Sequence, residues 1–143
     1  MRNHDHKATS GLAQDIEMDC VDAAGQSMKL DASLGYQSSD PYAVAVTFRT
    51  PGGDVVWTFA RELLARGLAA PAGEGDVHVW PCLSSDGRAV IIIELRSPDG
   101  ELLVQAPAQE VTAFVNQTIA LVPEGAESSR FDIDELIGQL LAG

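Results

Sequence analysis

The sequence predicts an α+β fold in which most strands pair antiparallel. Short segments with alternating apolar and polar residues recur through the chain, a pattern that is typical of half-buried strands. Segments with helical spacing follow runs of strands instead of alternating with single strands, which argues against a parallel doubly wound sheet. About seven strands and three helices are expected on this basis.

Four strands and one helix are expected in the first half of the chain. The strands are rich in alternating, β-branched or aromatic residues, and turn-forming residues separate them. They cover residues 16–20, 27–34, 42–48 and 55–59. In the second strand the apolar face carries Met28, Leu30, Ala32 and Leu34.

The expected helix at 60–68 has a period of 3.6 and ends near Gly67 and Pro71. We expect Leu63, Leu64 and Leu68 to face inward, and Arg61, Glu62 and Arg66 to face outward.

The second half repeats this organisation. Strands are expected at 77–81, 89–95 and 101–105, and a long helix is expected to begin at Pro107. Its buried face would carry Val111, Phe114, Val115, Thr118 and Ile119. Asp132 and Glu135 have the spacing of a capping box, which predicts a C-terminal helix.

Length and composition indicate one domain. The chain has 143 residues, of which 45% are hydrophobic, enough for a single core. Residues 1–12 lack apolar periodicity and are expected to form a disordered tail, which leaves 13–143 as the domain. The longest aliphatic run, 89–93, is far shorter than the roughly 20 residues of a membrane span, and no secretory signal is evident, so we expect a cytoplasmic protein without membrane insertion.

Charge and motifs argue against several functions. Nine Lys and Arg against 21 Asp and Glu give a net charge of -12, which makes nucleic acid an unfavourable partner. The chain has no hydrolase, Walker, zinc-protease or dinucleotide-binding motif, so we expect no enzyme activity, cofactor or metal. Cys20 and Cys82 are far apart and are interpreted as small core residues.

Three side chains are candidates for contacts with a partner protein: Arg61, Arg66 and His78. Exposed arginines are frequent interface anchors, and His78 alternates with Val77 and Val79, which places it on the wet face of its strand. The same arginines, with Arg88, Arg96 and exposed aromatic residues, could instead bind single-stranded nucleic acid, although the aromatic residues lie in apolar strands and fit a core better.

Six segments, in order and in register, resemble the SsgA-like proteins, a family of actinobacterial regulators of sporulation-specific cell division. They are DPYAV at 40–44, WTFARELLARGL at 57–68, GDVHVWP at 75–81, SPDGE at 97–101, APA at 106–108 and FDIDEL at 131–136. The resemblance extends from about residue 14 to the end of the chain.

The resemblance implies a noncatalytic protein with two mainly antiparallel sheets and helices, similar to the Whirly fold of single-stranded nucleic-acid-binding proteins. It also implies a homotrimer that is recruited to the division septum and helps position the tubulin-like protein FtsZ there, with an SsgA-type protein as partner. The alternative function that the fold implies is single-stranded nucleic-acid binding.

Overall fold

The computed structural model describes residues 11–21, 24–128 and 140–141. Within these ranges the elements follow a repeated order, four strands and then a helix. The first set is β1 (Gly11–Val21), β2 (Ser27–Gln37), β3 (Ala43–Thr50), β4 (Gly53–Ala60) and α1 (Arg61–Gly67). The second set is β5 (Ala72–Glu74), β6 (Val77–Leu83), β7 (Ala89–Ser97), β8 (Gly100–Pro107) and α2 (Ala108–Leu121). The expected α+β class is therefore confirmed.

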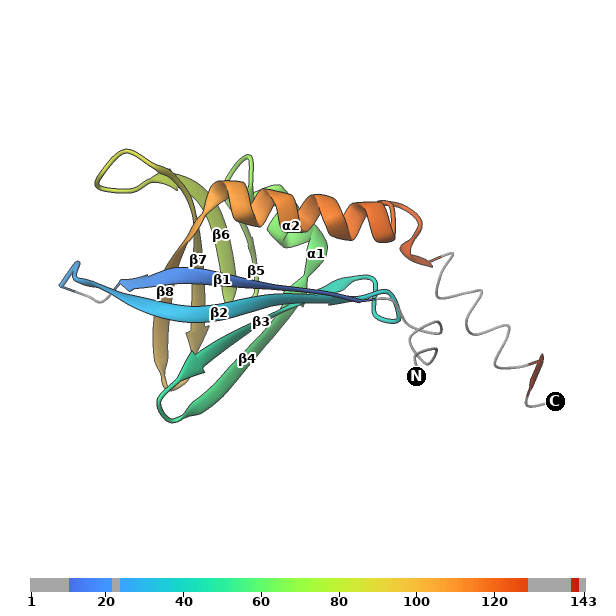
Figure 1. Ribbon diagram of the computed structural model, residues 1–143, viewed down its shortest axis with the longest axis horizontal. Helices are drawn as coiled ribbons and strands as arrows, with labels where there is room; N and C mark the ends of the chain where they lie inside the picture. The colour runs from blue at the N-terminus through green and yellow to red at the C-terminus, as the bar shows by residue number, and fades with distance from the viewer. Residues whose placement is uncertain (1–10, 22–23, 129–139, 142–143) are drawn as a thin grey trace.

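All eight strands belong to one antiparallel sheet with the order β4-β3-β2-β1-β8-β7-β6-β5, so the expected division into two sheets is not observed. The two halves are joined by a short ladder in which only Asp19, Cys20 and Val21 of β1 pair with β8. Figure 1 shows β1 and β2 running across the view, whereas β7 and β8 run at a steep angle to β1 and β2. The sheet is strongly curled at this narrow junction.

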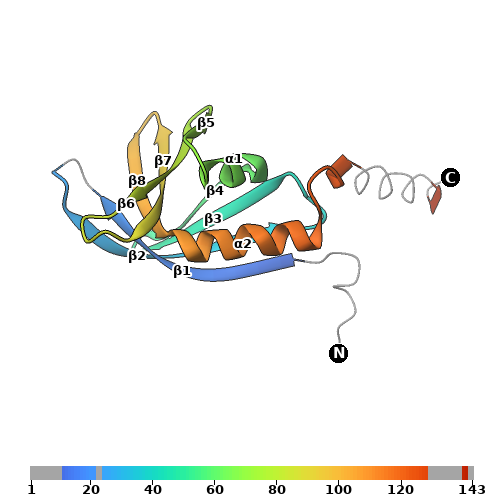
Figure 2. The ribbon, with the colours of Figure 1, turned by 90° about the horizontal axis from the view of Figure 1, so that it is seen from above.

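The core lies between the curled sheet and the two helices. Helix α2 contacts β1, β7 and β8, and it also contacts α1. It runs beside β1 and β2 on one side of the sheet (Figure 2). The predicted inward residues Val111, Phe114, Val115 and Thr118 are buried, and Ile119 is half-buried against the core. Amphipathic packing of this helix was therefore correctly predicted from its spacing.

Several sequence-based expectations need correction. Strand β1 begins at Gly11, and β2 continues to Gln37, so that Tyr36 is a buried strand residue. Met28 was expected in the apolar face of β2 but is 68% exposed, because it pairs with Cys20 next to the turn of the β1–β2 hairpin, beyond the core. Cys82 is exposed, since it lies at the end of β6. The expected C-terminal helix falls outside the described residues except for 140–141.

Helix α1 packs against the strands of the second half through small and aliphatic residues. Leu63 and Leu64 are buried as expected. A Cβ added at Gly67 would lie 2.3 Å from a side-chain carbon of Val79, so the helix backbone approaches β6 closely and only glycine fits there.

Leu64→Ala should lower the free energy of unfolding by about 2–5 kcal/mol, because it removes a fully buried leucine and leaves a cavity. Arg66→Ala, in the same helix and half-exposed, should change stability by about 0.5 kcal/mol or less. Denaturant titration followed by circular dichroism measures both. Equal stability of the two variants would contradict the packing described for α1.

Candidate functional site

Arg61 does not face outward as the sequence analysis expected. It is the first residue of α1, and its side chain is 3% exposed. Its backbone N–H donates to the Tyr42 carbonyl at 2.7 Å, which fixes the start of the helix against the segment before β3. Arg61 shares a helical face with Leu64 and Leu68, at intervals of three and seven residues, so the side chain follows the apolar stripe into the protein.

The Arg61 guanidinium binds the C-terminal end of α2. Its Nη1 donates to the carbonyl oxygens of Thr118 at 2.9 Å and Val122 at 2.7 Å. The last turn of α2 contains no basic residue of its own. Carbonyl groups at a helix C-terminus lack intrahelical partners and carry partial negative charge, so a cation from another element stabilises them.

The same guanidinium forms a short ion pair and an aromatic contact. Its Nη2 lies 2.6 Å from Oε2 of Glu127, and its central carbon lies 5.2 Å from the centre of the Tyr36 ring. The Tyr36 hydroxyl in turn donates to the Pro41 carbonyl at 2.9 Å. One side chain therefore connects α1, α2, β2 and the segment that follows α2.

Glu127 is oriented by two donors. Oε2 accepts from Arg61, and Oε1 accepts from the backbone N–H of Gly125 at 2.8 Å. The hydrogen bond from Arg61 lowers the pKa of the Glu127 carboxyl below its ordinary value of 4.5, although partial burial opposes this shift. Glu127 is therefore ionised at neutral pH, as the ion pair requires.

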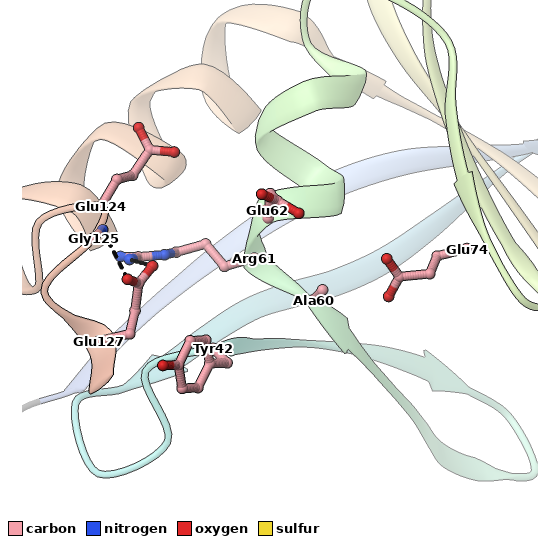
Figure 3. A pocket seen from close by; sticks show the side chains of 8 residues that line it. All are labelled: Tyr42, Ala60, Arg61, Glu62, Glu74, Glu124, Gly125 and Glu127. Atoms are coloured by element: carbon pink, nitrogen blue, oxygen red, sulfur yellow. Dashed lines mark hydrogen bonds and ion pairs between the residues drawn. The ribbon is translucent and has the colours of Figure 1, made fainter. Parts of the chain in front are cut away.

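A pocket of about 440 Å³ opens beside this ion pair, between the start of α1, the end of β5 and the loop after α2. Figure 3 shows its lining side chains. The lining residues are Tyr42, Ala60, Arg61, Glu62, Glu74, Glu124, Gly125 and Glu127. Four of them are glutamates, and the single cation is already bonded to protein oxygens. The pocket is thus strongly negative.

The other two candidate residues lie at the surface, Arg66 on α1 and His78 on β6. Arg66 is half-exposed and pairs with Glu62 at 3.6 Å within α1. His78 is 41% exposed, and its Nδ1 lies 3.5 Å from Oε1 of Glu94 in β7. Val79 meets α1, and successive strand residues point to opposite faces, so His78 faces away from that helix. The structure does not bring the three candidates together.

No group of three or more His, Cys, Asp and Glu side chains in 11–21, 24–128 and 140–141 could hold a metal ion. No helix in the same ranges is long and apolar enough to cross a membrane.

Comparison with known proteins identifies the family. Residues 30–127 match the family described as "Streptomyces sporulation and cell division protein, SsgA". The chain belongs to the SsgA family. It is 43% identical over 129 residues to the sporulation-specific cell division protein SsgB of Streptomyces coelicolor, a match covering 90% of this chain and 93% of that protein. SsgB of Kineococcus radiotolerans is also 43% identical, over 90% of this chain and 78% of that protein.

Solved structures of the SsgA family share the fold. A structure from work on SsgB mutations that correlate to longitudinal cell division during sporulation of Streptomyces coelicolor superposes with a TM-score of 0.81 at 41% identity, covering 85% of this chain and 96% of that one. An SsgA-like protein of Thermobifida fusca gives a TM-score of 0.83 at 33% identity, covering 91% and 95%. The curled sheet with two helices is therefore the fold of this family.

Arg61→Ala should lower the free energy of unfolding by about 3–5 kcal/mol, because it removes one partner of a buried ion pair and the Arg61 donors to the Thr118 and Val122 carbonyls. Glu127 would keep only the Gly125 N–H as a donor, and the Thr118 carbonyl only the Val122 N–H. Arg61→Lys should be intermediate, since an ammonium group lacks the planar fork that reaches three oxygens. Chemical denaturation measures the series. An alanine variant as stable as the native protein would refute the assigned role.

The stability difference between the native protein and Glu127→Gln should depend on pH. The folded-state pKa of Glu127 is lowered, so its stabilising contribution is present above the unfolded-state pKa and is lost as the pH falls through the folded-state pKa. The difference should be largest near neutral pH and should vanish at acidic pH, below the ordinary value of 4.5. Thermal melts across this range measure it, and a difference that grows on acidification would have the wrong sign.

Proposed function

We propose that the protein is a noncatalytic adaptor in sporulation-specific cell division, which acts through contacts with other proteins. The observation that carries the proposal is the 43% identity to SsgB of Streptomyces coelicolor over 90% of this chain and 93% of that protein. At this level of identity and coverage the whole domain is shared, and not only a local motif.

The proposed partners are FtsZ and an SsgA-type protein, and the proposed place of action is the division septum, to which the protein is recruited from the cytoplasm. The printed names of the relatives support cell division during sporulation. The resemblance of the six sequence segments supports FtsZ positioning as the specific task. A homotrimer is proposed on the same resemblance, and light scattering tests it against the chain mass of 15.1 kDa.

Arg66 and His78 are proposed as partner contacts, whereas Arg61 is not, because its donors are already bonded within the protein. Arg66 and His78 both expose a large part of their side chains. Arg66 lies on α1, and His78 lies on the face of β6 that is turned away from α1, so each would belong to a separate contact surface.

The purified protein should retain purified FtsZ in a pull-down at physiological salt. Arg66→Ala and His78→Ala should each weaken retention while leaving thermal stability almost unchanged, because both side chains are at the surface. Asp99→Ala, at an exposed turn, is the matched control and should bind like the native protein. Absence of FtsZ binding by the native protein, alone and with an SsgA-type protein present, would overturn the adaptor proposal.

Single-stranded nucleic-acid binding is the rival function. The net charge of -12 opposes the approach of phosphates, and binding to single strands depends on cationic grooves. Tight binding of single-stranded DNA at physiological salt would favour the rival and count against the adaptor.

A further inference from the structure

The two edges of the sheet differ in how they are protected from pairing with another strand. At one edge, β5 has only three residues, and the adjacent end of β6 contains Pro81, which cannot donate a backbone hydrogen bond. At the other edge, β4 has eight residues and, among the strands within residues 11–21 and 24–128, pairs only with β3. Natural edge strands are usually shortened, charged or interrupted, so β4 is unusual.

The side chains of β4 do not block pairing. Val55 is 46% exposed and Val56 is 58% exposed, and Asp54 at the start of the strand is its one charged residue. A row of unpaired backbone groups beside exposed β-branched side chains is the chemistry that accepts an added strand.

The acidic pocket lies where β4 ends. Ala60, the last residue of β4, lines the pocket together with Glu74 of β5 (Figure 3). A strand added along β4 would therefore end at the carboxylates of Glu62, Glu74 and Glu124. Arg61 does not neutralise these three groups, since its ion pair is with Glu127. Glu62 has an exposed ion pair with Arg66 at 3.6 Å, so Glu74 and Glu124 are the main acidic groups offered to a ligand.

The pocket also presents an aromatic surface. Tyr42 lines it and is 46% exposed. A guanidinium group can bind carboxylates through its planar fork and can stack on an aromatic ring at the same time. Arginine therefore fits this combination of groups better than lysine does.

We propose that the free edge of β4 and the acidic pocket at its end together bind an extended segment of a partner protein, whose backbone pairs with β4 and whose arginine enters the pocket. Charge complementarity selects this occupant, because the pocket and the whole chain are negative. The proposal rests on the adaptor function, since it names the kind of segment that an adaptor recognises at this surface.

The test is a titration of the uniformly ¹⁵N-labelled full chain with a synthetic peptide. The probe alternates threonine and valine, has about the length of β4, and carries arginine at its N-terminal end, where antiparallel pairing would place it beside the pocket. Backbone amide shifts should change along β4 and at Gly125. A peptide with glutamate in place of arginine, and one with a central proline, should each bind markedly more weakly.

Variants of the protein separate the two parts of the surface. Glu74→Gln and Glu124→Gln should each weaken binding of the arginine peptide by about twofold to fivefold, and added salt should weaken it further. Glu101→Gln removes an exposed glutamate outside the pocket and should have no effect. Val56→Lys should weaken binding of the arginine peptide by charge repulsion at the edge, whereas Val56→Thr should preserve it.

Three outcomes would overturn the inference. They are the absence of shifts along β4, equal binding of the arginine and glutamate peptides, and self-association that occupies β4 and is abolished by Val56→Lys. The peptide titration contains no FtsZ, so the two proposals can fail separately. If the arginine peptide binds at β4 but the protein does not bind FtsZ, only the adaptor role is refuted. Retention of FtsZ without peptide binding at β4 would refute this inference alone.

Discussion

The contact between Arg61 and the end of α2 holds the two halves of the molecule together at the helices. Within the described ranges, each half consists of four strands and a helix, and the sheet joins them through only three residue pairs of β1 and β8. Arg61 belongs to α1, the helix of the first half. Its oxygen partners are Thr118 in α2, the helix of the second half, and Val122 and Glu127 just after α2. The β1–β8 ladder and the Arg61 contacts therefore connect the two halves at two separate places.

Residue periodicity predicted the strands of the described ranges except β5, and both helices, but not how the strands join. Ile16 and Met18 are buried, and Glu17 is exposed between them, as alternation predicts. The pairing of β1 with β8 joins Asp19 to Gln105 and Val21 to Leu103, which are far apart in the sequence, and no local pattern specifies so short a ladder. For that reason one curled sheet could not be distinguished from two sheets. The start of β2 at Ser27 was predicted correctly, but its end was placed at Leu34 instead of Gln37.

Arg61 shows why the candidate site was only partly predictable. Its spacing from Leu64 and Leu68 placed it on the buried face, but its charge suggested the surface, and residue type was given more weight than position. A buried arginine is stable only where oxygen partners converge, and here they come from residues 118–127, which spacing near residue 61 cannot reveal. The acidic pocket is equally nonlocal, because its glutamates come from α1, β5 and the loop after α2.

The buried ion pair also sets the electrostatic character of the surface. Arg61 and Glu127 neutralise each other, so the remaining groups carry the whole net charge of -12. A net charge of this size repels polyanions at long range. At short range, the carboxylates of the pocket favour the binding of a cation. Arg61 is the one cation that lines the pocket, and its donors are bonded to Thr118, Val122 and Glu127. It is therefore not available to pair with the other pocket glutamates, Glu62, Glu74 and Glu124. The interaction that stabilises the fold thereby leaves the neighbouring surface selective for basic partners.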